Sequence, residues 1–193
     1  MSGRDNKSIK ILEIGCGSGA NLWMLAKEGF DVYGIDNSVT SLNLAKEHLN
    51  NKWNVDADIC VGSFDRIPYD DNMFDYVIDI VSMQHIDLKT SKDALKEVYR
   101  VLKPKGKFFS YRLSDHSVMY ENDECERIDA ATISNIPKGL PLAGNGTTSF
   151  WSPSLARYIY GETGLKVESI ERRARCYAGG VYNVEYLAII GVK

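Results

Sequence analysis

Residues 9–20 read IKILEIGCGSGA, and the prediction of the fold class starts from this stretch. Its first half, Ile9–Ile14, is a short apolar run that stops at a glycine, which is typical of a buried strand. The following segment, Ala20–Glu28, carries leucine and alanine at helical spacing and ends at Gly29, which predicts a helix. A strand, a glycine-rich turn and a helix in this order indicate an α/β domain.

The alternation of strands and helices continues to residue 112. Further strands are expected at Asp31–Ile35, Asp58–Val61, Phe74–Val81 and Lys107–Arg112. Helices are expected from Ser38, as the N-cap, to about Asn50, and over Lys89–Leu102. Five strands with helical crossovers predict a parallel sheet that is covered on both faces.

The pattern changes after Arg112. Residues 114–148 are polar and rich in glycine and proline, with one expected helix near Asp123–Ala131. A helix over Ser152–Gly161 and an antiparallel pair of strands, Val167–Arg173 and Val181–Val192, complete the chain. An irregular segment of this length inside a compact domain is more often functional than not.

Composition excludes several classes of protein. The 193 residues suffice for one α/β domain, and 44% hydrophobic with 25% charged residues is typical of a soluble globular protein. With a net charge of −3, the protein lacks the excess of basic residues that is typical of a general nucleic-acid binder. No apolar run approaches the roughly 20 residues of a membrane span, and the polar start MSGRDNKSIK shows no secretory signal. We therefore expect a cytoplasmic protein that binds neither nucleic acid nor membrane.

The cysteines and histidines do not form a recognisable site. The four cysteines contain no CxxC pair, and the three histidines lack the spacing of metal ligands. Reduced thiols and no metal site are expected.

The motif that carries chemistry is Glu13-Ile14-Gly15-Cys16-Gly17-Ser18-Gly19, between the first strand and the first helix. Glycines allow a tight turn and a close approach of backbone N–H groups to a ligand, and the helix N-terminus adds partial positive charge. Asp36 follows Gly17 by nineteen residues, at the end of the second strand, where a carboxylate can accept hydrogen bonds from both ribose hydroxyls. Together these features predict a nucleoside site.

A nicotinamide dinucleotide is the first alternative, because Gly15-x-Gly17-x-x-Ala20 satisfies the loose fingerprint. Glu13, however, would place negative charge beside a pyrophosphate, whereas it suits a ligand with a positive amino group and a sulfonium. The Tyr99-x-x-x-Lys103 spacing of one dehydrogenase acid–base pair falls at a helix end. We therefore reject the dehydrogenase.

Four segments in order, ILEIGCGSG, YGID, FDYVIDIVSMQHI and ALKEVYRVLKPKGKFF, resemble a class I S-adenosylmethionine-dependent methyltransferase of the small-molecule type over about residues 9–112. The resemblance implies an α/β, doubly wound, Rossmann-like sheet of seven mostly parallel strands with helices on both faces. The implied strand order is 3-2-1-4-5-7-6, with strand 7 antiparallel.

The resemblance also implies the residues that hold S-adenosylmethionine and its product S-adenosylhomocysteine. The loop around the methionine part would comprise Gly15, Cys16, Gly17 and Gly19. Glu13 would meet the amino group, through water, and Asp36 the ribose hydroxyls. Ile80 and Val81, at the end of the fourth strand, would line the methionine and sulfonium region.

The adenine contacts depart from the family pattern. Asn37 would lie at the edge of the adenine ring. Ser63 stands where the family usually has an acidic residue that accepts a hydrogen bond from the adenine amino group. A hydroxyl accepts the same hydrogen bond more weakly, and Asp65 is an alternative acceptor. Phe64 would lie against the ring, or else pack in the core.

Candidates for a general base are His85, after the fourth strand, and Asp115 and His116, after the fifth. The alternative for His85 is a hydrogen bond to the backbone at a helix start. An acceptor that is already anionic needs no base.

Acceptor-binding residues are expected around an irregular lid at about 113–150, with Phe150 and Trp151 as apolar walls and Gly144-Asn145-Gly146 as a hinge. Arg112 and Arg173 are candidates to bind an acceptor carboxylate or phosphate. The alternative for each arginine is a solvated basic edge of the sheet.

The sequence thus predicts a single methyltransferase domain, residues 1–193, that methylates a small, anionic metabolite or glycan precursor. A non-catalytic nucleoside-binding regulatory subunit of the same fold is the second hypothesis. A nucleic-acid methyltransferase is the third, and Ile80-Val81-Ser82 stands where its Pro-Pro-Tyr-like motif would be. The acceptor, the methylated atom and the oligomeric state stay open.

Overall fold

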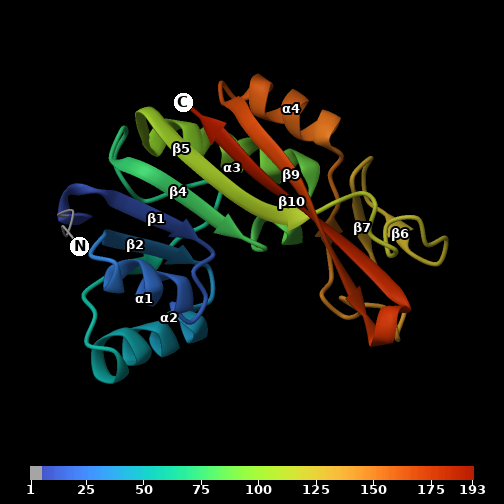
Figure 1. Ribbon diagram of the computed structural model, residues 1–193, viewed down its shortest axis with the longest axis horizontal. Helices are drawn as coiled ribbons and strands as arrows, with labels where there is room; N and C mark the ends of the chain where they lie inside the picture. The colour runs from blue at the N-terminus through green and yellow to red at the C-terminus, as the bar shows by residue number, and fades with distance from the viewer. Residues whose placement is uncertain (1–5) are drawn as a thin grey trace.

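The computed structural model describes residues 6–193 and contains a seven-stranded sheet in the order β3-β2-β1-β4-β5-β10-β9 (Figure 1). The strands are β1 (Lys10–Ile14), β2 (Asp31–Asp36), β3 (Asp58–Val61), β4 (Phe74–Ile80), β5 (Leu102–Leu113), β9 (Lys166–Tyr177) and β10 (Tyr182–Val192). The first five pair in parallel, whereas β10 runs antiparallel to both neighbours. The predicted order and the antiparallel seventh strand are confirmed.

Helices cover both faces of the sheet, as predicted. One cluster of buried side chains joins the sheet to α1 (Ala20–Lys27) and α2 (Val39–Lys46), which continues as a π-helical turn over Glu47–Lys52. The main core joins the opposite face to α3 (Leu88–Val101) and α4 (Pro153–Glu162). Short 3-10 turns occur at Asn6–Ser8, Met83–His85 and Ala178–Gly180.

Two helix starts follow the predicted capping chemistry. The Oγ atom of Ser38 accepts a hydrogen bond of 3.2 Å from the N–H of Ser41, and Oγ of Ser152 accepts one of 3.0 Å from Leu155. Each bond satisfies a backbone donor that the first turn of a helix leaves unpaired.

The prediction of a helix near Asp123–Ala131 is wrong. This part of the chain forms turns and a small sheet of β6 (Glu126–Arg127), β7 (Thr132–Ser134) and β8 (Thr148–Ser149). The carboxylate of Asp129 accepts hydrogen bonds from the N–H of Ala131 (2.8 Å) and from the N–H of Leu88 (2.9 Å). Because aspartate side chains offer the backbone such partners, a turn replaces the helix.

The irregular segment is anchored by a core of its own. Leu113, Met119, Ile133 and Phe150 are fully or almost fully buried and pack with Val184 of β10. Phe150 and Trp151, expected as walls of the acceptor site, lie in the core instead. The segment around 113–150 is therefore largely part of the folded body.

Residues 1–5, part of the polar start in which no secretory signal is expected, lie outside the described residues. Over 6–193, none of the helices is long and apolar enough to cross a membrane.

Candidate functional site

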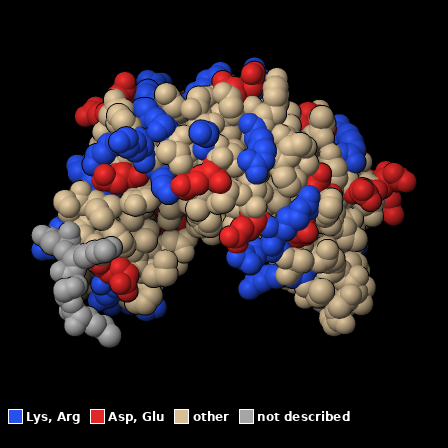
Figure 2. All heavy atoms as spheres, turned by 45° about the horizontal axis from the view of Figure 1, so that its top comes forward, with Lys and Arg blue, Asp and Glu red and all other residues tan. Residues whose placement is uncertain are grey.

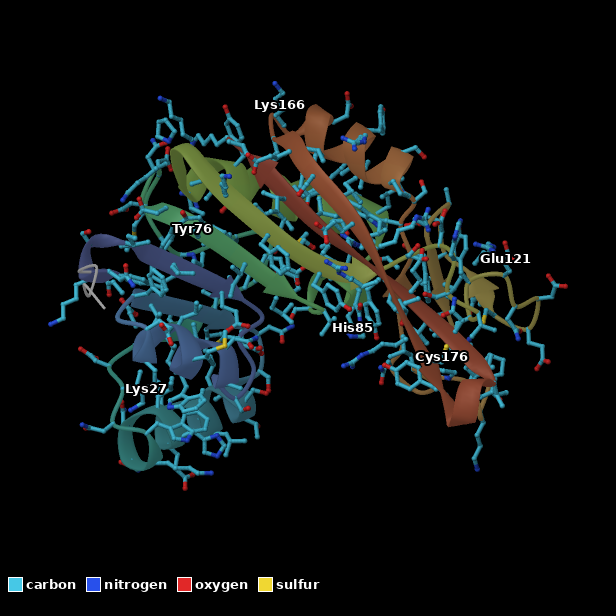
Figure 3. The ribbon with its side chains drawn as sticks, viewed as in Figure 1. Lys27, Tyr76, His85, Glu121, Lys166 and Cys176 are labelled. Atoms are coloured by element: carbon cyan, nitrogen blue, oxygen red, sulfur yellow. The ribbon has the colours of Figure 1, made fainter. Side chains whose placement is uncertain are left out.

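A cavity of about 400 Å³ opens at the carboxyl ends of β1, β2 and β4. Its lining residues are Gly15, Gly17, Asp36, Asn37, Phe64, Val81, Ser82, His85 and Ile86. The carboxyl ends of parallel strands form the usual ligand crevice of doubly wound sheets. Figure 2 shows the molecule deeply hollowed between its two lobes, and His85 lies at the inner side of this hollow in Figure 3.

The turn after β1 requires glycine for two different reasons. Gly15 has φ +72°, and a Cβ atom there would lie 2.4 Å from Cβ of Ser82, whose Oγ donates a 3.0 Å hydrogen bond to the Gly15 carbonyl. Gly17 has φ +52°, and a Cβ there would meet nothing within 4 Å. The turn is therefore packed closely on β4 at Gly15 and open to the cavity at Gly17.

Glu13 of β1 is a buried carboxylate with one oxygen satisfied. Glu13 is only 2% exposed, and its Oε1 atom accepts a 2.7 Å hydrogen bond from Nδ2 of Asn21. Oε2 is buried and has no hydrogen-bond partner. Desolvation raises the pKa of Glu13 to about 7, despite the hydrogen bond from Asn21. An unpaired buried acceptor of this kind fits a cationic ligand group.

Asp36 ends β2 and holds the turn. Oδ2 accepts a 2.9 Å hydrogen bond from the N–H of Gly17, and Oδ1 accepts one of 2.8 Å from Ser38. A carboxylate offers about four acceptor positions, so each oxygen keeps one for a ligand hydroxyl. The half-buried side chain lines the cavity.

The end of β4 is held by a buried carboxylate that the sequence did not single out. Oδ1 of Asp79 accepts hydrogen bonds from the N–H groups of Ser82 (3.0 Å) and Met83 (2.9 Å), and Oδ2 accepts one of 2.7 Å from Ser110. Burial raises the pKa of Asp79. Val81 adopts φ +57°, which is rare for a β-branched residue and marks strain at the cavity wall.

Of the residues assigned to the adenine from the sequence, some line the cavity and others do not. Phe64 and Asn37 line the cavity, and Phe64 also packs against the main core. Ser63 is exposed and its hydroxyl donates a short hydrogen bond to Asp65. Ile80 does not line the cavity, whereas its neighbour Val81 does.

Three further residues at the site escaped the sequence analysis: Ser82 and Ile86, which line the cavity, and Asn21, which binds Glu13. The only available signal was their position: Ser82 and Ile86 follow β4, and Asn21 lies in the first turn of α1 after the glycine turn.

His85 is the candidate base that the structure places at the cavity. Its ring is exposed, and Nε2 lies 3.4 Å from Nε2 of Gln84. His116 is 62% exposed with Nδ1 3.8 Å from Oε1 of Glu185, and Asp115 accepts a hydrogen bond of 3.3 Å from Ser114. Neither Asp115 nor His116 lines this cavity.

Of the two arginine candidates, Arg112 is buried and Arg173 is exposed. Arg112 is 1% exposed, its Cζ atom lies 3.4 Å from the ring centroid of Trp151, and Nη2 donates a 2.8 Å hydrogen bond to Ser149. Burial lowers the pKa of Arg112 to about 10. Arg112 and Trp151 thus form part of the core and are not open to an acceptor. Arg173 is 63% exposed and forms a short ion pair with Glu171.

Over residues 6–193, no group of three or more His, Cys, Asp or Glu side chains is placed to hold a metal ion. Cys16 is buried within the glycine turn, and desolvation raises the pKa of its thiol to about 12. It is an unreactive small residue at neutral pH.

Comparison with known proteins identifies the family. A family model described as a methyltransferase domain matches residues 12–110. The chain is 32% identical over 139 residues to 24-methylenesterol C-methyltransferase 2 of Arabidopsis thaliana, covering 70% of this chain and 37% of the relative. It is 33% identical over 126 residues to the ubiquinone/menaquinone biosynthesis C-methyltransferase UbiE of Rickettsia akari, covering 61% of this chain and 50% of the relative.

Solved structures share the fold over nearly the whole chain. A SAM-dependent methyltransferase of Methanosarcina mazei superposes with a TM-score of 0.76 at 21% identity, covering 95% of this chain and 92% of its own. A Burkholderia thailandensis 1,6-didemethyltoxoflavin-N1-methyltransferase, solved with its acceptor and S-adenosylhomocysteine, gives 0.72 at 14% identity, covering 95% of this chain and 70% of its own.

The chain spans between about a third and a half of the length of the curated relatives named above. The family model nevertheless matches more than half of the chain and includes the glycine turn, Asp36 and β4. The chain therefore belongs to the methyltransferase-domain family, the class I S-adenosylmethionine-dependent methyltransferases.

Proposed function

We propose that this protein transfers a methyl group from S-adenosylmethionine to a small-molecule acceptor. The observation that carries the proposal is the buried, unpartnered Oε2 of Glu13, two residues before the turn in which Gly15 and Gly17 line a cavity together with Asp36. A cationic amino group satisfies Glu13, whereas a pyrophosphate would be repelled by it.

Different residues at the site would hold different parts of the cofactor. Glu13 would hold the amino group, directly or through water, and Asp36 the ribose hydroxyls. Phe64 and Asn37 would contact the adenine, and Val81 would line the sulfonium region. When bound, S-adenosylmethionine supplies a methyl group activated by the sulfonium. The protein contributes by holding an acceptor atom in line with that methyl group and by excluding water.

His85 is the general base of the proposal. Its exposed imidazole lines the cavity beside Val81, so it can reach an acceptor hydroxyl or amine without crossing the core. Proton removal by a positioned imidazole contributes typically about 10²–10⁴-fold to a rate. Asp115 and His116 remain alternatives that require a different acceptor pose.

The small-molecule class is supported by the relatives, whose names specify sterol and ubiquinone/menaquinone C-methylation. An anionic group on the acceptor would meet Arg173, since Arg112 is buried. We also propose that the fold acts as a single domain in the cytoplasm. Its lid would be limited to about residues 143–147, before β8, because Leu140 and Leu142 pack against the buried cluster that anchors the irregular segment.

Calorimetric titration with S-adenosylhomocysteine tests the cofactor. We expect micromolar binding by the wild-type protein, loss of binding in Asp36→Ala, and no binding of NADH. Absence of S-adenosylhomocysteine binding, or equal binding of NADH, would refute the cofactor assignment.

A regulatory subunit without activity is the second candidate function. Incubation with a metabolite extract and S-adenosylmethionine carrying a deuterated methyl group separates the two. A labelled product that depends on His85 supports the enzyme, whereas binding without any labelled product supports the regulatory subunit.

A further inference from the structure

A second cavity of about 380 Å³ lies between the irregular segment and the β9–β10 hairpin. Leu140, Pro141 and Leu142 form one wall, and Tyr177, Tyr182 and Tyr186 form the other. The size and the apolar, aromatic lining match those of small-molecule sites. We propose that this tyrosine pocket binds a flat, apolar ring system, which is the body of the methyl acceptor; the second half of this statement rests on the proposed function.

An apolar tract connects the tyrosine pocket with the cofactor cavity. The rings of Tyr186 and Tyr111 stack with centroids 4.8 Å apart and planes at 11°. The carbonyl of Tyr111 accepts a 2.8 Å hydrogen bond from the N–H of Val81, which lines the cofactor cavity. Val81, Tyr111, Leu140 and Leu142 pack against the same buried cluster, to which Tyr186 belongs. The tyrosine pocket and the cofactor cavity therefore border the same apolar cluster, from opposite ends.

Backbone strain is present at both ends of this tract. Leu142 in the pocket has φ +66°, and Val81 at the cofactor cavity has φ +57°. The left-handed region is unfavourable for a residue with a Cβ, and glycine or asparagine would occupy it more easily. Leucine at position 142 thus places an apolar side chain on the pocket wall in spite of this unfavourable backbone conformation. Strain of this kind occurs preferentially at ligand sites.

The pocket provides aromatic faces rather than charge. Tyr182 and Leu142 are half-buried and Tyr177 is 37% exposed, so apolar surface is open to a ligand. Desolvation raises the pKa of the Tyr186 hydroxyl to about 12, which keeps it neutral. Neutral tyrosine rings favour a flat apolar partner by stacking and by area burial. The hairpin carrying these tyrosines faces the hollow that His85 borders (Figure 3).

The test uses N-phenyl-1-naphthylamine, a neutral fluorophore that joins a flat naphthalene ring system to a phenyl ring, titrated into the full chain. We expect saturable binding to the wild-type protein and at least fivefold weaker binding to Leu142→Asn. Asparagine tolerates the left-handed backbone, so this variant removes the apolar wall without a new strain. Leu44→Asn, at an exposed leucine of α2, is the matched control and should bind the probe as the wild type does. Tyr182→Ala is a second variant on the opposite wall.

The outcomes separate the pocket from the proposed function. Non-saturable probe binding, or equal affinity in Leu142→Asn, Tyr182→Ala and Leu44→Asn, would overturn the pocket. Displacement of the probe by S-adenosylhomocysteine would place it in the cofactor cavity and would also overturn the proposal. Failure of S-adenosylhomocysteine to bind, with variant-sensitive probe binding retained, would leave the ring site standing and refute the methyltransferase activity.

Discussion

The backbone N–H of Gly17 donates a 2.9 Å hydrogen bond to Oδ2 of Asp36, a residue nineteen positions further along the chain. Because Oδ1 of the same carboxylate accepts from Ser38, one side chain holds both the glycine turn after β1 and the start of α2. The carboxylate expected to bind ribose therefore also shapes the turn that surrounds the cofactor.

Substituting Asp36 should affect binding and stability together. Asp36→Ala leaves the N–H groups of Gly17 and Ser38 without their acceptor, and each lost partner costs about 1–3 kcal/mol when it is not replaced by water. We expect at least tenfold weaker binding of S-adenosylhomocysteine in calorimetry and a lower midpoint of urea unfolding. Thr40→Ala, at an exposed position of α2, serves as the control. Unchanged stability in Asp36→Ala would contradict the role of Asp36 in holding the turn.

The raised pKa of Glu13 predicts a pH-dependent stability. The folded-state pKa is about 7 against an ordinary value of 4.5, so the folded protein retains a proton that the unfolded chain loses between these values. The free energy of unfolding should therefore fall as pH rises from about 4.5 to 7, by on the order of 3 kcal/mol, and change no further above that. Urea titrations of the wild type and of Glu13→Gln isolate this contribution, because glutamine keeps an oxygen for Asn21 and does not titrate.

The same carboxylate should couple pH to cofactor affinity. A cationic amino group near Oε2 favours the ionised form of Glu13, so S-adenosylhomocysteine should bind more tightly as pH rises towards 7. Glu13→Gln should weaken binding and flatten this dependence. A wild-type affinity that is constant between pH 5 and 7 would argue against contact between Glu13 and the amino group.

Arg112 should matter for folding. Removing a buried arginine that stacks on Trp151 and is attracted by Asp79 breaks a buried charge interaction, which typically costs about 3–5 kcal/mol. We expect Arg112→Ala to lower the free energy of unfolding by this amount, whereas the exposed Arg173→Gln should change it by less than about 0.5 kcal/mol. A stable Arg112→Ala with only a raised KM would restore the anion-binding role that the sequence suggested.

His85 should act on turnover and leave cofactor binding unchanged. If its imidazole removes a proton from the acceptor, His85→Gln should lower kcat about 10²-fold or more, with an unchanged Kd for S-adenosylhomocysteine. His116→Gln tests the alternative base: its side chain is 62% exposed and does not line the cofactor cavity, so this variant should keep the full rate if His85 is the base. A full rate in His85→Gln would indicate an acceptor that needs no base.

The strands and helices up to residue 112, the glycine turn and the position of Asp36 at the end of a strand could be predicted from the amino-acid sequence alone. These depend on local chemistry: an apolar run ends in glycines, a serine precedes a helix, and the chain alternates between strand and helix. The seven-stranded order followed from the resemblance of four segments to a known family. The helix expected near Asp123–Ala131 failed because Asp129 bonds to the backbone of Leu88, a partner 41 residues away.

Which polar side chains are buried could be read only from the folded structure. Arg112 and Arg173 differ little as residues in a strand, yet one stacks on Trp151 in the core and the other is 63% exposed. The tyrosine pocket likewise joins Leu142 to Tyr186 across 44 positions of chain. Burial and contact between distant segments depend on how the sheet and the irregular segment pack together. Patterns of neighbouring residues in the sequence do not predict that packing.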